Sequence, residues 1–283
     1  MNYMRKIPSA IITDAVKKMC ISANCNLDSA ILKELKDAQK KNQSPAAQKA
    51  LADTVKNAEI ALSKTVPICQ DTGMAVFFVK IGKSVFVEGD NLDIAIEKGV
   101  SAGYKEGFLR KSIVSDPLNR TNTGDNTPPV IHYSFDDSDK IEITFLPKGF
   151  GSENKSALKM LNPSDEKEGI IAFVLETVKK AGANPCPPII LGIGIGGNFE
   201  KCAQLSKFAL ARSIDIPNPD PFYADLEKEI LNKVNELGIG PQGYGGETTA
   251  LGVNIEVFPT HIAGLPVAVN ISCHATRHQT VII

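Results

Sequence analysis

The segment that most constrains the fold is C-P-P-I-I-L-G-I-G-I-G-G, at residues 186–197. It is an apolar run that ends in glycines, which is typical of a buried strand. Apolar residues then recur at helical spacing over 199–212, directly after the glycines. A buried strand that leads straight into a helix indicates a fold in which helices pack against a sheet.

Other parts of the chain carry similar patterns. In residues 27–41, Leu27, Ile31 and Leu35 recur at i, i+4 and i+8 with charged residues between them. We expect further helices over 45–64, 92–110, 166–181 and 221–237, strands over 75–81, 250–257 and 265–271, and a hairpin of 130–135 with 140–146. These patterns predict an α/β mixed fold with amphipathic helices packed around a mixed β-sheet and with long functional loops. We expect a single compact unit over residues 1–283, without a separate C-terminal domain.

Composition limits the classes of partner. The chain has 283 residues, of which 31 are basic and 32 acidic, so its net charge of −1 gives no reason to expect nucleic acid or a membrane surface as partner. The N-terminus lacks the apolar region of a secretory signal, and no segment approaches the roughly 18 apolar residues that a membrane helix needs. We therefore expect a cytoplasmic protein, whose six cysteines are thiols or metal ligands rather than disulfides.

The glycines that end the apolar run contain a dinucleotide-binding pattern, Gly192-x-Gly194-x-x-Gly197, between a strand and a helix. Asp215 lies near the place expected for the ribose-binding acid. That acid should end a second apolar strand, yet its neighbours read S-I-D-I-P-N-P-D-P, and no βαβ alternation surrounds it. We therefore favour a tight turn or an anion site at a helix N-terminus.

A zinc site is the second alternative. Cys273, His274 and His278 lie within the short sequence C-H-A-T-R-H. Structural zinc needs four ligands, usually in paired short spacings such as C-x-x-C, and this chain contains no C-x-x-C. The sequence therefore argues against zinc.

Three cysteines lie in unusual loops: Cys69 precedes Q-D-T-G, Cys186 lies in N-P-C-P-P, and Cys273 precedes H-A-T-R-H. Prolines on both sides fix the backbone around Cys186, as a rigidly placed ligand would require. Spacing alone does not distinguish ligands of an iron–sulfur cluster from scattered, inert thiols. We expect the other three to be buried and inert: Cys20, Cys25 and Cys202.

Two charged or titratable residues are further candidates. His261 lies in a loop shortly before Cys273, near enough along the chain to reach the same site. Arg110 is expected to end the helix over 92–110, ahead of the long polar loop 115–129, and is a candidate clamp for a carboxylate.

Taken together, the motifs resemble a known family. In chain order they are P-I-C-Q-D-T-G (67–73), L-R-K-S-I-V-S-D-P-L-N-R (109–120), N-T-G-D-N-T-P-P (122–129), K-G-F-G-S-E-N-K (148–155), A-G-A-N-P-C-P-P (181–188), G-I-G-I-G-G-N-F-E-K (192–201) and P-T-H-I-A-G-L-P-V-A-V-N-I-S-C-H-A-T-R-H (259–278). This series resembles the iron–sulfur-dependent class I fumarate hydratases and L-tartrate dehydratases, specifically their N-terminal domain or separate alpha subunit. The resemblance spans essentially the whole chain.

The resemblance implies a [4Fe–4S] cluster held by Cys69, Cys186 and Cys273, with one iron that has no cysteine ligand and acts as a Lewis acid on the substrate hydroxyl and carboxylate. It implies catalytic roles for Asp71 and His261. It also implies three substrate-binding residues: Gln70, Arg110 and Gly151.

From this resemblance we expect the alpha subunit of a hydro-lyase that interconverts malate and fumarate. The nearest alternative is L-tartrate dehydratase, which forms oxaloacetate, and a more distant one is a non-catalytic, redox-sensing iron–sulfur protein. In single-chain members a further C-terminal domain supplies more of the active site, including the group that transfers a proton. This chain lacks that domain, so the resemblance implies a beta subunit and an α2β2 heterotetramer.

Overall fold

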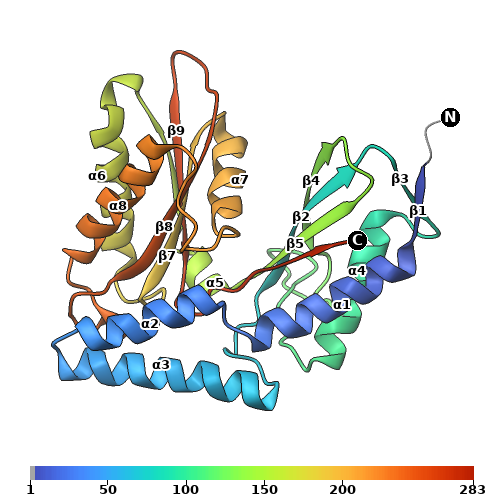
Figure 1. Ribbon diagram of the computed structural model, residues 1–283, viewed down its shortest axis with the longest axis horizontal. Helices are drawn as coiled ribbons and strands as arrows, with labels where there is room; N and C mark the ends of the chain where they lie inside the picture. The colour runs from blue at the N-terminus through green and yellow to red at the C-terminus, as the bar shows by residue number, and fades with distance from the viewer. Residues whose placement is uncertain (1–3) are drawn as a thin grey trace. The chain divides into compact units, whose positions relative to one another are not determined.

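The structure is a computed structural model that describes residues 4–283; residues 1–3, with which the N-terminal segment considered above begins, lie outside the described part. The described residues form two units. Unit 1 comprises the residues up to Asn26, Ala61–Gly149 and Arg277–Ile283, and unit 2 comprises Leu27–Ile60 and Phe150–Thr276. Each unit has helices and a mixed four-stranded sheet of its own, which confirms the α/β mixed class (Figure 1). The sequence patterns did not indicate a division into two units.

Unit 1 is built on a sheet with the strand order β10-β5-β2-β4. Its strands are β2 (Met74–Gly82), β4 (Val130–Asp136), β5 (Ile141–Lys148) and β10 (Gln279–Ile282), and a separate parallel pair is formed by β1 (Arg5–Pro8) and β3 (Val85–Glu88). Helices α1 (Ser9–Cys25) and α4 (Leu92–Glu106) pack side by side (Figure 1). Their apolar faces form one core with β2 and β5, in which Val16, Ile96, Phe77 and Phe145 are fully buried. Tyr104 of this core donates to the carbonyl of Thr72, just before β2.

The predicted hairpin of 130–135 with 140–146 is wrong in its pairing, although both strands exist. β4 pairs with β2 in parallel and β5 pairs with β2 antiparallel, so β2 lies between them. The connecting residues pass around the end of β2, where Gly82 N donates to Lys140 O at 2.8 Å and Lys83 N donates to Asp136 O at 2.9 Å. A Cβ on Gly82 would lie 2.3 Å from Ser138 O, so only glycine permits this passage.

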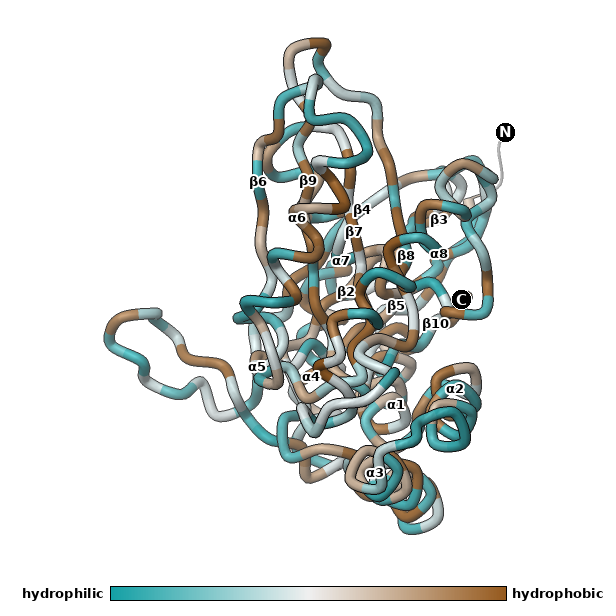
Figure 2. Tube along the Cα trace, turned by 90° about the vertical axis from the view of Figure 1, so that its left-hand side faces the viewer, coloured by the Kyte–Doolittle hydropathy of each residue, from teal (hydrophilic) through white to brown (hydrophobic). Residues whose placement is uncertain are grey.

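Unit 2 contains the apolar strand that follows Cys186. Its sheet has the order β6-β9-β7-β8, from β6 (Ala157–Leu161), β7 (Ile189–Gly196), β8 (Ala250–Phe258) and β9 (Leu265–Ser272), with β7 and β8 parallel. Its helices are α2 (Ser29–Lys41), α5 (Phe150–Glu153), α6 (Glu166–Ala181), α7 (Phe199–Ala209) and α8 (Pro221–Asn235), with short 3₁₀ turns at Pro163–Asp165 and Pro241–Gly243. Helix α3 (Pro45–Lys64) begins in unit 2 and ends in unit 1. Hydrophobic residues follow β7, β8 and β9 along their length (Figure 2).

Helices cover both faces of the sheet in unit 2. In β7, Leu191, Ile193 and Ile195 join the core formed with α6 and α8, whereas α7 packs on the opposite face (Figure 1). On that face a Cβ on Gly192 or Gly194 would lie 2.1 Å or 2.0 Å from a backbone oxygen of α7. These glycines therefore serve helix–strand packing, and Asp215 lies in an exposed turn, which accounts for the pattern without a dinucleotide.

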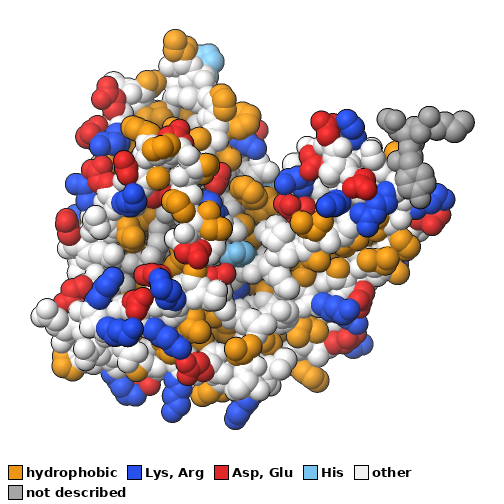
Figure 3. All heavy atoms as spheres, in the orientation of Figure 1, with side chains coloured by type: hydrophobic (Ala, Val, Ile, Leu, Met, Phe, Trp, Pro, Cys, Tyr) orange, Lys and Arg blue, Asp and Glu red, His pale blue; other side chains and the backbone are white. Residues whose placement is uncertain are grey.

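The surface carries charges of both signs. Basic and acidic side chains are interspersed on the face drawn in Figure 3, and several form exposed pairs such as Lys36–Glu59 and Lys49–Asp53. Over residues 4–283, no helix combines the length and the apolar character that crossing a bilayer requires.

Candidate active site

The loop 67–73 of unit 1 carries the first predicted ligand. It lies between α3 and β2, and Gly73 at its end has a φ of 78°. The amide N of Asp71 donates to Cys69 Sγ at 3.4 Å, and Asp71 Oδ1 accepts from Gly73 N at 3.0 Å. An amide that donates to a cysteine sulfur is one of the features that tune iron–sulfur centres. The loop therefore offers a sulfur that is already oriented by its own backbone.

Buried side chains hold the other side of this loop. The hydroxyl of Tyr104, on α4, donates to Thr72 O at 2.8 Å and lies 2.9 Å from Gly73 O, and Asn126 Nδ2 donates to Gly73 O at 3.2 Å. Tyr104 and Asn126 are both fully buried. Burial raises the pKa of the Tyr104 hydroxyl far above its usual value, so this group remains a donor. The carbonyls at the end of the loop are thus fixed by the core of unit 1.

Arg110 lies four residues beyond the end of α4 at Glu106 rather than closing that helix as predicted. Its amide N donates to Thr72 Oγ1 at 2.9 Å, and the Thr72 hydroxyl in turn lies 3.3 Å from Arg110 O. Thr72 is 2% exposed, whereas the side chain of Arg110 is on the surface. The guanidinium of Arg110 is therefore exposed to solvent, while its backbone is hydrogen-bonded to the Cys69 loop through Thr72.

In unit 2, Cys186 and Cys273 lie in loops that contact each other. Cys186 follows α6 and has a φ of 54°, a strained value for a residue other than glycine, and its carbonyl accepts from His274 N at 3.4 Å. His274 Nδ1 also lies 2.9 Å from Cys186 O and 3.2 Å from Gln242 Nε2, so one ring nitrogen contacts both groups. Cys273 O accepts from the amide and the hydroxyl of Thr276 at 3.0 Å and 2.7 Å.

A second contact fixes the residue after Cys186. Gln242, in the glycine-rich loop after α8, donates to Pro187 O from its backbone N at 2.7 Å and from Nε2 at 2.9 Å. Gln242 and His274 together hold the Cys186–Pro187 backbone next to Cys273. Within unit 2 the structure thus brings two of the predicted ligands together.

The glycine-rich segment before β6 forms the short helix α5. Gly151 lies on α5, and no heavy atom of the described residues lies within 4 Å of a Cβ built on it. At the end of α5, Glu153 pairs with Lys207 of α7 and accepts from Asn270 Nδ2 of β9 at 3.1 Å. Burial lowers the pKa of Lys207, and the Glu153 carboxylate opposes this shift. This partly buried pair fixes the position of the segment that carries Gly151.

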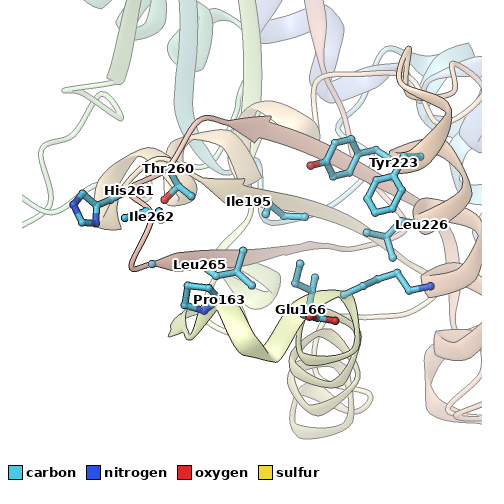
Figure 4. A pocket seen from close by; sticks show the side chains of 13 residues that line it. Pro163, Glu166, Ile195, Tyr223, Leu226, Thr260, His261, Ile262 and Leu265 are labelled. Atoms are coloured by element: carbon cyan, nitrogen blue, oxygen red, sulfur yellow. The ribbon is translucent and has the colours of Figure 1, made fainter.

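His261 does not lie near Cys273 within unit 2. It is exposed in the turn between β8 and β9, with Nδ1 accepting from Ala263 N at 3.2 Å, whereas Cys273 follows the other end of β9. The eight residues of β9 span about 26 Å at about 3.3 Å per residue. His261 instead borders a pocket of about 370 Å³, in which Ile195 and Leu265 lie between it and Tyr223 (Figure 4).

The cysteines divide into two sets, and no disulfide joins any of them within residues 4–283. The accessible set contains the three predicted ligands: Cys69, Cys186 and Cys273. The other set is buried, and burial raises the pKa of each of its thiols: Cys20, Cys25 and Cys202. Iron binds thiolates, so the accessible set fits an iron–sulfur cluster and the buried set does not.

The predicted ligand set is shared between the units, because Cys69 belongs to unit 1 and Cys186 and Cys273 belong to unit 2. Accordingly, within neither unit do three or more His, Cys, Asp or Glu side chains of residues 4–283 gather as a metal site would require.

Several residues that hold these loops were not identified as site residues from the sequence. Thr72 lies in the Q-D-T-G loop and Gln242 lies in a glycine-rich loop, both of which the sequence marks as unusual. Asn126 lies in the N-T-G-D-N-T-P-P motif, where a polar residue in a functional loop could have marked it as a candidate. Tyr104 and Glu153 had no signal of their own, because their roles depend on partners distant in the chain.

Comparison with known proteins supports the family resemblance. The model of the family Fumarate hydratase (Fumerase) matches residues 13–282. The chain is 45% identical over 273 residues to a putative L(+)-tartrate dehydratase subunit alpha from Methanocaldococcus jannaschii, a match that covers 94% of this chain and 95% of that protein. It is 34% identical over 255 residues to the L(+)-tartrate dehydratase subunit alpha of Escherichia coli (strain K12), covering 89% and 83%.

Proposed function

Because the chain belongs to the fumarate hydratase (Fumerase) family of hydro-lyases, we propose that it is the alpha subunit of an L-tartrate dehydratase. The observation that carries the proposal is the 45% identity, over nearly the full length of both chains, to a protein named as the alpha subunit of such an enzyme. The relatives therefore favour tartrate over the malate–fumarate reaction that the motifs first suggested. Fumarate hydration is the second candidate, because the family model is named for it.

We propose that Cys69, Cys186 and Cys273 hold a [4Fe–4S] cluster, supported by their accessibility and by the ordered loops around them. When bound, the cluster supplies a Lewis acid to the hydroxyl that leaves. The chain's part is to keep three thiolates in place. The amide of Asp71 donates to the sulfur of Cys69, and His274 and Gln242 fix the backbone at Cys186.

The substrate is a dicarboxylate, so the site needs cations and donors for its two carboxylates. We assign Arg110 to one carboxylate, because its guanidinium is exposed on a backbone that Thr72 holds to the Cys69 loop. Gln70 and the amide of Gly151 are the neutral donors that the resemblance adds, and Asp71 is the carboxylate of the site. His261 is not included in the site of its own chain, because the length of β9 separates it from Cys273.

Dehydration removes a hydroxide from one carbon and a proton from the next, which gives the enol of oxaloacetate from tartrate and, after tautomerisation, oxaloacetate and water. We propose that a beta subunit supplies the base for that proton and completes an α2β2 assembly. The names of the relatives, each an alpha subunit, support a partner of this kind.

The test is an assay of the anaerobically reconstituted chain with L-tartrate and with malate, alone and mixed with the beta subunit. We expect oxaloacetate from tartrate in the mixture and no sustained turnover by the chain alone. Preferential turnover of malate would establish the second candidate instead. Full activity of the chain alone would contradict the need for a partner.

A further inference from the structure

Arg277, in the C-H-A-T-R-H motif, is a buried cation for which residues 4–283 provide no ion pair. It is 5% exposed and belongs to unit 1. Its Nη2 donates to Asp71 O at 3.1 Å, and its Nε and Nη1 have no hydrogen-bond partner among the described residues. A guanidinium has five N–H donors and stays charged at every pH at which the protein is folded. Such an arrangement is costly unless negative charge lies close by.

The groups around Arg277 identify where that negative charge can come from. Its charge acts on Cys25 and Tyr104, but burial raises the pKa of both, so both are neutral near pH 7. The remaining neighbour is the Cys69 loop, whose negative groups are the Asp71 carboxylate, which also acts on Tyr104, and the thiolate that Cys69 carries when it binds a metal. Asp71 joins the two: its carbonyl accepts from Arg277, and its amide donates to Cys69 Sγ at 3.4 Å. A single residue therefore separates the guanidinium from the proposed ligand sulfur.

We propose that Arg277 is the fixed positive charge that balances the thiolate of Cys69 and the cluster bound to it, and that it positions the ligand loop through Asp71. This inference rests on the proposed cluster. A buried positive charge beside a redox centre stabilises the reduced form, because that form carries one more negative charge. Arg277 is thus a positioning residue whose charge sets how firmly, and at what potential, the cluster is held.

The structure offers matched variants that separate charge from anchoring. R277Q removes the charge and keeps an amide that can donate to Asp71 O. R277K keeps the charge and loses the planar fork. Y104F removes a neutral anchor of the same loop, which bonds Thr72 O at 2.8 Å, and leaves the charge unchanged. Tyr104 therefore serves as the control for loop anchoring alone.

Each variant is prepared with and without the cluster. The measurements are iron and sulfide per chain, the midpoint potential from a redox titration followed by electron paramagnetic resonance, and Tm of the cluster-free chain. We expect R277Q to lose most of its iron during chelator challenge and to shift the potential to more negative values. We expect R277K and Y104F to keep the wild-type potential.

The cluster-free chain gives the sharpest result. If Arg277 balances the cluster, R277Q relieves an unbalanced buried charge, and Tm of the cluster-free chain stays the same or rises. If Arg277 is only a structural anchor, R277Q lowers the Tm of the cluster-free chain or does not fold, and any cluster it still binds keeps the wild-type midpoint potential. A lower Tm, a failure to fold or an unchanged potential would each overturn the inference. Absence of iron from the wild-type chain would instead refute the cluster itself.

Discussion

The two units hold their cysteines in different ways. In unit 1 a single cysteine lies on a loop whose carbonyls are captured by side chains of the core, among them Tyr104 and Asn126. In unit 2 two cysteines lie on loops that are fixed largely to each other, through His274 and the carbonyl of Cys186. The difference teaches that the position of Cys69 depends on the packing of one whole unit, whereas that of Cys186 depends on a few contacts near the surface.

The largest expected effect comes from removing a ligand in either unit. Replacing Cys69, Cys186 or Cys273 by Ser should abolish iron binding, because a serine hydroxyl is a poor ligand for iron in a cluster. Iron and sulfide analysis after anaerobic reconstitution measures this loss.

Cys202→Ser is the matched control. It should retain iron and lose about 1 kcal/mol of unfolding free energy or less, because the buried serine hydroxyl can donate to Phe199 O, which lies 3.3 Å from Cys202 Sγ. Loss of iron from Cys202→Ser together with its retention in Cys186→Ser would contradict the ligand assignment.

The next largest effect concerns Arg110 and the Thr72 hydroxyl that holds its backbone. Arg110→Gln should lower kcat/KM about 100-fold, because charge-assisted hydrogen bonds to a substrate carboxylate are worth about 1.5–3 kcal/mol. Thr72→Val, which removes only the hydroxyl that holds the backbone of Arg110, should lower it about fivefold. Steady-state kinetics of the assembled enzyme give both values. A larger effect from Thr72→Val than from Arg110→Gln would place the binding role elsewhere on the loop.

A smaller effect should distinguish the two ways of holding cysteines. His274→Phe removes the ring nitrogen that lies 2.9 Å from Cys186 O, and we expect iron to be lost to a chelator about fivefold faster, since a net hydrogen bond contributes about 1 kcal/mol. The global unfolding free energy of the cluster-free chain should change little, because the contact lies near the surface. If His274→Phe destabilises the whole chain as Tyr104→Phe should, the contrast between the units fails.

The smallest effect is a pH dependence of the buried thiols. Burial raises the pKa of Cys20, Cys25 and Cys202, so folding favours their protonated forms. Their contribution to stability is complete below the ordinary thiol pKa of 9.0 and is lost as pH rises above it, since only the unfolded chain then releases the protons. Alkylation of the cluster-free native chain at pH 8, read by mass spectrometry, should label the three accessible cysteines and spare these. Labelling of Cys20 would contradict the prediction that burial protects these thiols.

Much of the local structure could be predicted from the sequence. Strong periodicity placed α2, α6, α7 and α8, and the apolar run 186–197 contains β7. Strand pairing could not be predicted, because it depends on distant residues. Gly82 lets the connection between β4 and β5 pass around β2, and β10 joins β5 from the other end of the sequence. The end of α4 was also missed, since Phe108 turns the chain out of the helix with a φ of 52°, which the residue type does not indicate.

The candidate site divides in the same way. The cysteines and Arg110 lie in motifs that can be recognised in the sequence. The distance between His261 and Cys273 could not be predicted from their separation along the chain, because the residues between them could form either an extended strand or a loop that folds back. The donors that hold the loops, such as Tyr104 and His274, become visible only when the partner carbonyls are known.

The order of segments in unit 1 has a consequence for biosynthesis. Its edge strand β10 and Arg277 come after all of unit 2 in the chain. During translation, which proceeds from the N-terminus, the segments of unit 2 therefore leave the ribosome before unit 1 has its last strand. Cys273 precedes Arg277 by only four residues, so the proposed third ligand and the cation beside the Cys69 loop leave the ribosome together, long after Cys69 itself. A cluster held by all three cysteines would therefore assemble only after both units are almost fully synthesised.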